Sequence, residues 1–346
     1  MANLSITNRC NRRCDYCFAR ESFQTDRIGV ADMSWDVFEK SLAFLIRSNI
    51  REVSLLGGEP TLHPEFLQFV DRLLDSGLRI LVFTGGLVNV RVLERLEQID
   101  EDRLSVLVNV VPPDTTNSYL VERQAVLYRH LGSRIVLGMN ITSPAVELGF
   151  LLDLIDQYEL SPYIRLGLAH PVLGGTNHYL HPRHYPEVGR RVTAFGLDAL
   201  SKGIGIGFDC GWVPCLFPEG GLSAMGMAPS DVGLRCNPII DVLPDGWSIA
   251  CYPLVSLSRK YLPNDQDASW LRSRFTRQLA PLRAFHLYKK CASCNWLEED
   301  ACMGGCIAAA MRRTRHADVA FSIAACHPTA GNKRVTPGEL TLHQVL

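Results

Sequence analysis

Three cysteines near the N-terminus have the spacing that most clearly indicates chemistry. Cys10, Cys14 and Cys17 lie within a span of eight residues, and no further cysteine follows before Cys210. Structural zinc sites and iron–sulfur cubanes both normally have four protein ligands. Three thiolates with no nearby fourth indicate a cubane with one open iron, to which a substrate can bind. The alternative is a zinc site that a distant residue completes.

A second motif, Gly57-Gly58-Glu59-Pro60, follows an apolar stretch at residues 52–56. Glycines let a backbone approach a ligand closely, and a carboxylate there can hold an ammonium group. For such a motif alone, the default interpretation is a tight turn with a solvated glutamate. Its place after the three cysteines favours a ligand-binding loop.

The two motifs together resemble the radical S-adenosylmethionine (radical SAM) superfamily. The resemblance implies that the three cysteines hold a 4Fe–4S cluster whose fourth iron binds the amine and carboxylate of S-adenosylmethionine. One-electron reduction then cleaves this cofactor to methionine and a 5′-deoxyadenosyl radical. Tyr16 lies between the second and third cysteines, where the family places an aromatic residue near the adenine. The 57–60 segment, with Glu59, corresponds to the part that binds the methionyl amine.

The resemblance assigns less specific roles to later positions. Asn109 stands where relatives often place a serine or an acidic residue near the ribose; alternatively it satisfies backbone groups at the strand ends. Thr84-Gly85-Gly86 stands where relatives often have Thr-Asn-Gly, so the asparagine is missing. The arginine that pairs with the cofactor carboxylate is either Arg123 or Arg129, and the sequence leaves this choice open.

A second set of cysteines follows position 235. Its members are Cys236, Cys251, Cys291, Cys294, Cys302, Cys306 and Cys326. Seven cysteines are too many for one zinc ribbon, but they could support two zinc sites or two iron–sulfur clusters.

The spacing of this set resembles the SPASM extension of radical SAM enzymes. That pattern opens with Cys-x9-Gly-x4-Cys, which Cys236, Gly246 and Cys251 match. It continues as Cys-x2-Cys-x5-Cys-x3-Cys, and here only the middle gap differs, with seven residues instead of five. The resemblance implies two auxiliary 4Fe–4S clusters. The ligands of one would be Cys291, Cys294, Cys302 and Cys326; those of the other would be Cys236, Cys251, Cys306 and a residue further upstream.

The upstream ligand is not defined by the pattern. Cys210 and Cys215 are the nearest candidates, and three interpretations stay open: ligation that closes the cluster, hydrogen-atom donation to a substrate radical, or a pair of buried inert thiols. Tyr252 follows Cys251, where anaerobic sulfatase maturases carry an acidic base. The chain therefore lacks the proton acceptor expected for formylglycine formation.

The elements that position these residues are predicted from hydrophobic periodicity. Strands are expected at 3–7, 52–56, 79–84, 103–111, 134–141 and 163–169. Helices are expected after Ser34, after Pro64, and at 89–98, 117–131, 144–158 and 186–202. Six strand–helix pairs predict an α/β fold with a parallel sheet, a partial (β/α)6 TIM-like barrel. The site is then expected at the C-terminal ends of the strands.

We expect the barrel to span residues 1–205, an auxiliary-cluster domain to span 206–330, and a short tail to span 331–346. A histidine-rich segment, 170–184, follows the sixth strand at the barrel mouth. We interpret it as a solvated loop with ordinary histidines, with a cover over the site as the alternative.

Composition excludes several classes of protein. Of 346 residues, 35 are Lys or Arg and 36 are Asp or Glu, so the basic excess typical of nucleic-acid binders is absent. No apolar run approaches the ~20 residues that span a bilayer, and the first ten residues do not form a signal peptide. Clustered cysteines in such a chain indicate metal rather than disulfides. We expect a cytoplasmic protein that binds neither nucleic acid nor membranes.

Enzymes with a SPASM extension mostly modify peptides, so the resemblance implies cross-linking or epimerisation of a ribosomally made peptide. The alternatives are a radical SAM dehydrogenase or rearrangement enzyme for a small molecule, a non-catalytic iron–sulfur electron carrier, and a zinc protein. The expected partners are a peptide substrate and an electron donor of the flavodoxin or ferredoxin type. Because the chain begins at its first strand, we expect a leader peptide to be recognised by a separate protein or by the enzyme's own surfaces.

Overall fold

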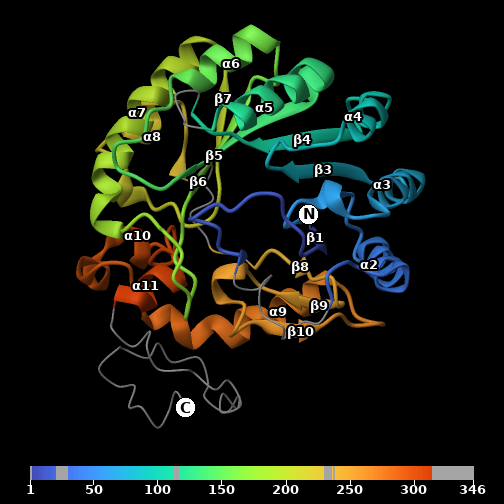
Figure 1. Ribbon diagram of the computed structural model, residues 1–346. Coiled ribbons are helices and arrows are strands. Elements are labelled where there is room, and N and C mark those ends of the chain that lie inside the picture. The colour runs from blue at the N-terminus through green and yellow to red at the C-terminus, as the bar shows by residue number, and fades with distance from the viewer. Residues whose placement is uncertain (1, 21–29, 113–116, 230–235, 237, 314–346) are drawn as a thin grey trace.

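The computed structural model describes residues 2–20, 30–112, 117–229, 236 and 238–313 (Figure 1). The strands are Ala2–Thr7 (β1), Glu52–Gly57 (β2), Arg79–Thr84 (β3), Leu104–Asn109 (β4), Ile135–Ile141 (β5), Tyr163–Leu168 (β6), Gly205–Phe208 (β7), Asp241–Val242 (β8), Trp247–Ile249 (β9) and Arg259–Tyr261 (β10). The helices are Trp35–Arg47 (α2), Phe66–Asp75 (α3), Val90–Glu97 (α4), Ser118–Leu131 (α5), Phe150–Tyr158 (α6), Tyr185–Ser201 (α7), Gly221–Ala224 (α8), Ala268–Leu279 (α9), Asn295–Glu298 (α10) and Ile307–Arg313 (α11).

The strands form one curved sheet in the order β10-β9-β8-β1-β2-β3-β4-β5-β6-β7. Neighbouring strands from β1 to β7 are parallel, β8 is parallel to β1, and β9 and β10 run antiparallel to their neighbours. The helices that connect the parallel strands lie outside the sheet (Figure 1). The partial-barrel prediction is therefore confirmed, with its strand ends facing one common edge.

Local sequence explains where the first helices begin. The side chain of Ser34 accepts a hydrogen bond from the Val37 amide at the start of α2, as the sequence predicts. Asn89 caps α4 in the same way. Helix α6 begins only at Phe150, six residues later than predicted, because Pro144 starts a turn rather than the helix. No helix in the described part of the chain is long and apolar enough to cross a membrane.

The sheet extends further in both directions than the sequence predicts. Strand β7 pairs with β6. The sequence did not predict this strand, because its four residues are too few and too glycine-rich to show a periodic pattern. Strand β8 pairs with β1, so the cysteine-rich part continues the same sheet. The predicted division between residues 205 and 206 falls within β7, and the two-domain division remains a prediction.

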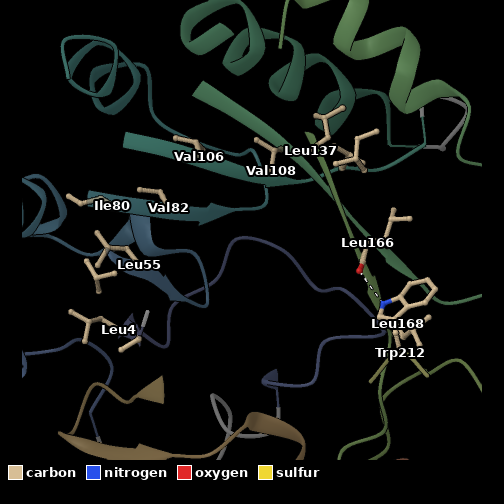
Figure 2. Packing of buried hydrophobic residues seen from close by; sticks show 14 of the residues in the cluster. Leu4, Leu55, Ile80, Val82, Val106, Val108, Leu137, Leu166, Leu168 and Trp212 are labelled. Carbon is tan, nitrogen blue, oxygen red and sulfur yellow. Dashed lines mark hydrogen bonds between the residues drawn. The ribbon is translucent and has the colours of Figure 1, made fainter. Parts of the chain in front are cut away.

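Buried apolar side chains from successive strands form the core behind the site. Figure 2 shows Leu4, Leu55, Val82 and Val106 in a row across β1 to β4. Helices close this layer from outside: Phe38 of α2 and Phe69 of α3, for example, are stacked with ring centroids 4.0 Å apart and are fully buried. The strands are thus held in place by apolar packing along their length.

One buried carboxyl group joins the C-terminal strands to β1. Asp241 of β8 accepts a hydrogen bond from the Asn3 side-chain amide at 2.6 Å. Burial raises the pKa of Asp241 from 3.8 to about 7, although the Asn3 hydrogen bond lowers it. Between pH 4 and pH 7 the folded protein therefore keeps a proton that the unfolded chain has lost. The contribution of this group to stability is present at pH 4 and decreases as the pH rises to 7.

We expect Asp241→Asn to remove this dependence, because an amide does not ionise and its oxygen still accepts from Asn3. As the pH rises from 4 to 7, the free energy of unfolding of the wild type should fall relative to that of the variant, by at most about 1.4 kcal/mol per pH unit. Denaturant unfolding of both proteins at pH 5 and pH 8 measures the difference. An identical pH dependence in the two proteins would contradict the prediction.

Candidate active site

The loop after β1 brings Cys10, Cys14 and Cys17 to the C-terminal edge of the sheet. The Cys17 amide donates to the Cys14 carbonyl at 3.3 Å, and the Arg12 amide lies 3.4 Å from the Cys10 sulfur. Asn11 fastens the loop to the β3–α4 connection by donating to the Leu87 carbonyl at 2.9 Å. The backbone therefore folds back on itself so that the three thiols lie near each other.

The chemistry of this thiol set fits a bound cluster. Burial is the largest cause that raises the pKa values of Cys10 and Cys17, and the neighbouring thiolates raise both further. Thiols that oppose each other's ionisation lose their protons readily when they share a cation. Among the residues that the structure describes, no three His, Cys, Asp or Glu side chains converge as they would around one metal ion. Each thiol of a cubane binds a different iron, so three thiols at separate positions of one loop can share a cluster.

The two glycines of the 57–60 motif serve the protein's own loop. Gly57 has φ of +148°, and a Cβ there would lie 2.3 Å from the Thr7 carbonyl oxygen. A Cβ on Gly58 would lie 2.1 Å from the Arg9 carbonyl oxygen and 2.9 Å from Cβ of Cys10. The sequence suggested that glycine makes room for a ligand. The structure shows that the room is taken by the segment that leads into the first cysteine motif.

Glu59 uses both carboxylate oxygens within the protein. Oε1 accepts from the Thr61 hydroxyl at 2.7 Å and from its amide at 3.4 Å. Oε2 accepts from the Thr84 hydroxyl and the Gly85 amide, both at 2.9 Å. The side chain is 1% exposed, and burial raises its pKa against the effect of these donors. Glu59 thus joins the end of β2 to the end of β3. The cofactor-binding role of the segment, which includes the buried Pro60, stays a prediction.

We expect Glu59→Gln to reduce the free energy of unfolding by about 1–3 kcal/mol, because the new amide NH₂ faces donors and leaves at least one buried donor unpaired. Urea unfolding measures this loss, with Glu94→Gln on the exposed face of α4 as the matched control. If Glu59 only held the methionyl amine, Glu59→Gln would instead raise the KM for S-adenosylmethionine and leave the free energy of unfolding unchanged.

A residue that the sequence did not single out, Arg12, explains the missing asparagine after Thr84. Its guanidinium donates to the carbonyls of Gly85 and Asn109, each at 3.1 Å. Gln124 of α5 donates to the same two carbonyls, at 3.1 and 3.0 Å. A Cβ on Gly85 would lie 2.4 Å from Cδ of Arg12, so only glycine leaves space for the arginine. No local pattern shows this pairing, because the residues are 73 positions apart.

Polar side chains at the ends of β4 to β7 form a second row. Asn140 donates to the Asn109 side-chain oxygen at 3.1 Å, which places Asn109 at the predicted edge. Arg165 pairs with Asp209 and lies 4.9 Å from the Phe83 ring. Asp209 follows β7, which was not predicted, so the sequence missed it as a site residue.

The carboxylate-binding role of Arg123 or Arg129 stays a prediction. Arg123 donates to the Val88 carbonyl at 2.7 Å, and Arg129 is exposed on α5. Arg12 lies in the loop after β1, with its guanidinium against the Gly85 and Asn109 carbonyls, and Arg165 lies within β6.

The histidine-rich segment contacts the first cysteine loop. The Asn177 side-chain amide donates to the Tyr16 carbonyl at 3.2 Å, and the His178 amide donates to the Asp15 carbonyl at 2.9 Å. Burial, followed by the nearby Cys14 thiol, raises the pKa of Tyr16. This part of the segment therefore lies against the loop that carries the thiols, while the His178 side chain stays exposed, as expected of a solvated loop.

The cysteines of the C-terminal part form two groups. Cys215, Cys291, Cys294 and Cys302 line one small cavity. The other group contains Cys210, Cys236, Cys251 and Cys306, whose mutual repulsion as thiolates adds to burial in raising the pKa values of Cys210 and Cys251. Cys210 as a whole residue is exposed to solvent. Protein atoms surround its sulfur closely, however, so burial is the largest cause that raises its pKa. Cys326 lies outside the described residues.

His170 lies beside the second group. One ring nitrogen, Nε2, is 3.0 Å from the Cys210 carbonyl and so donates to it. Burial would lower the pKa of His170, but the adjacent Cys306 thiolate raises it to about 9. Burial would correspondingly raise the pKa of Cys306, but His170 lowers it to about 7. The first histidine of the histidine-rich segment is therefore a buried partner of this group, not a solvated residue.

Sequence comparison matches the N-terminal part of the chain. A family model described as the Radical SAM superfamily matches residues 4–127. A GTP 3',8-cyclase of Limosilactobacillus fermentum is 29% identical over 116 residues, which are 32% of this chain and 34% of that protein. A 7-carboxy-7-deazaguanine synthase of Thermoplasma acidophilum is 26% identical over 155 residues, covering 44% of this chain and 66% of that protein. The chain thus spans about a third of the length of the cyclase.

Structural comparison extends over most of the chain. The structure of anSMEcpe with bound AdoMet has a TM-score of 0.63 and 18% identity, and the match covers 88% of both chains. Streptococcus suis SuiB bound to precursor peptide SuiA has a TM-score of 0.62 and 15% identity, with 88% of this chain and 71% of that chain covered. At these identities the likeness concerns the fold, and it includes the cysteine-rich part.

Proposed function

We propose that the chain, whose residues 4–127 match the Radical SAM superfamily model, is a radical SAM enzyme that modifies a peptide. The proposal rests on how much of the chain the structural match covers. It covers 88% of this chain in SuiB bound to its precursor peptide and in anSMEcpe bound to AdoMet and the Cp18Cys peptide. The curated relatives match over 32% and 44% of this chain, and the residues that match the family model, 4–127, carry the predicted cofactor site whatever the substrate is.

In this proposal each part of the site has its own task. Cys10, Cys14 and Cys17 would hold a 4Fe–4S cluster, which would supply the one-electron chemistry for cleavage of S-adenosylmethionine. Glu59 keeps the ends of β2 and β3 together beside it. The cationic side chain of Arg12 is positioned to attract an anionic group such as the cofactor carboxylate.

The histidine-rich segment and the cysteine-rich part would enclose the reaction. Asn177 and His178 already contact the first cysteine loop, so this segment restricts access of water to the strand ends. The two C-terminal cysteine groups would hold auxiliary 4Fe–4S clusters, which can accept the electron left after hydrogen abstraction. An external flavodoxin or ferredoxin would supply electrons, and a separate protein could deliver the peptide.

The experiment is a mass measurement in heavy water. The reduced, anaerobically reconstituted enzyme receives S-adenosylmethionine and short peptides encoded beside its gene, with the Cys14→Ala variant as control. Loss of two hydrogens from a peptide indicates oxidative cross-linking or desaturation. Gain of one deuterium indicates epimerisation. Deoxyadenosine without a peptide mass change, together with turnover of a purine nucleotide, would instead support the small-molecule alternative that the cyclase relatives favour.

A further inference from the structure

The loop between β7 and α8 carries two cysteines, and each contacts a different group. Trp212 lies between Cys210 and Cys215, is fully buried, and donates from its indole nitrogen to the Leu166 carbonyl at 3.2 Å (Figure 2). Its ring also stacks on Phe217, with centroids 5.7 Å apart. The loop is therefore fixed to the end of β6, and the positions of both thiols are fixed with it.

Cys215 faces the segment that carries the Cys-x2-Cys motif. It lines the same small cavity as Cys291, Cys294 and Cys302. The segments around this cavity pack closely. A Cβ on Gly305 would lie 3.1 Å from Leu287 and 3.4 Å from Val213, so the backbone at Gly305 lies close to both residues. Because Cys291 and Cys302 are buried, the cavity places four sulfur atoms in surroundings with little water.

A cationic side chain lies beside this cavity. The Lys290 ammonium is 5.4 Å from the centroid of the Tyr288 ring, which lines the cavity with the four cysteines. Four thiols that share one buried space are the donor set of a 4Fe–4S cluster, and each would release its proton on binding iron.

We propose that Cys215 is the fourth ligand of the cluster that binds Cys291, Cys294 and Cys302, in the position that the SPASM pattern gives to Cys326. This inference rests on the proposed function, in which the C-terminal cysteines hold iron–sulfur clusters. The other cluster then takes Cys210 as its upstream ligand. The described residues thus supply eight thiols for two cubanes, and Cys326 has no iron to bind.

The assignment is tested by counting iron. A background variant with Cys10, Cys14 and Cys17 all changed to alanine removes the first cluster, so that iron and sulfide report only the auxiliary ones. We expect Cys215→Ala in this background to lose up to half of the remaining iron, or to convert one cluster to a three-iron form with its own electron paramagnetic resonance signal. Cys326→Ala should leave both readouts unchanged. Loss of iron from Cys326→Ala but not from Cys215→Ala would overturn the proposal.

A second variant covers the case in which Cys215→Ala loses all iron because the region unfolds. Serine can bind iron through its oxygen, so Cys215→Ser should keep the cluster but shift its resonance signal. An unshifted signal in Cys215→Ser would overturn the assignment. The iron count does not depend on any substrate. A negative peptide assay therefore leaves this test intact, and a wrong ligand assignment leaves the peptide assay interpretable.

Discussion

Replacing Cys14 with alanine is expected to abolish cleavage of S-adenosylmethionine. Loss of residues that merely support a metal ligand typically costs 10–100-fold in affinity or activity, so loss of a ligand itself should lower the rate of deoxyadenosine formation by more than about 100-fold. Two thiols cannot keep three irons of a cubane in place. The loop itself should stay folded, because the Cys14 carbonyl, which alanine retains, accepts the hydrogen bond from the Cys17 amide. The measurement is deoxyadenosine released by the reduced enzyme.

The matched control is Arg13→Ala. Arg13 is the exposed neighbour of Cys14 in the same loop, so its removal should preserve most of the activity. Iron content separates the two explanations for inactivity, because Cys14→Ala should lose the iron of one cluster and keep that of the others. Retention of normal deoxyadenosine formation in Cys14→Ala would remove the basis for assigning the first motif to cofactor cleavage.

The parts of the fold that could be predicted are those with a strong local signal. Six buried strands and the start of the helix after Ser34 could be predicted because apolar spacing and a capping side chain act within one element. Strand β7 and the pairing of β8 with β1 could not, because their stability comes from partners that are distant in the sequence.

The candidate site shows the same division. Cys10, Cys14 and Cys17 could be proposed as ligands because they lie in one loop, where spacing sets the geometry. The grouping of Cys215 with Cys291, however, depends on how the β7–α8 loop packs against a segment some 75 residues later. The pattern alone placed both Cys210 and Cys215 as candidates for a single position. The structure separates them because Trp212 fixes the loop between them.

The cofactor-binding role of the 57–60 segment stays a prediction, and the structure adds contacts that this segment makes within the protein. Gly57 and Gly58 were interpreted as space for a ligand, and Glu59 as a partner for an ammonium group. Their contacts are instead with Thr7, Arg9 and the end of β3. The motif therefore keeps the first cysteine loop against the sheet, and this role should be separable from cofactor binding by substitution.

Gly58→Ala should separate the two roles, because its expected defect is in assembly of the first cluster rather than in cofactor affinity alone. The new Cβ would lie 2.1 Å from the Arg9 carbonyl oxygen, and that oxygen accepts from the Glu59 amide at 2.7 Å. Relief of the overlap must therefore break a backbone hydrogen bond and displace Cys10. We expect a loss of about 1–3 kcal/mol in the free energy of unfolding and loss of the iron of the first cluster on reconstitution.

Gly149→Ala, at the start of α6, is the control for adding a methyl group to a glycine. Its φ of −54° suits alanine, and nothing lies within 4 Å of the added carbon, so stability should change by less than about 1 kcal/mol. The variant Gly58→Ala could instead keep its iron and its stability and only raise the KM for S-adenosylmethionine. In that case S-adenosylmethionine would occupy the space beside Gly58. Glycine would then be required at position 58 by the cofactor, and the close approach of Arg9 would be incidental.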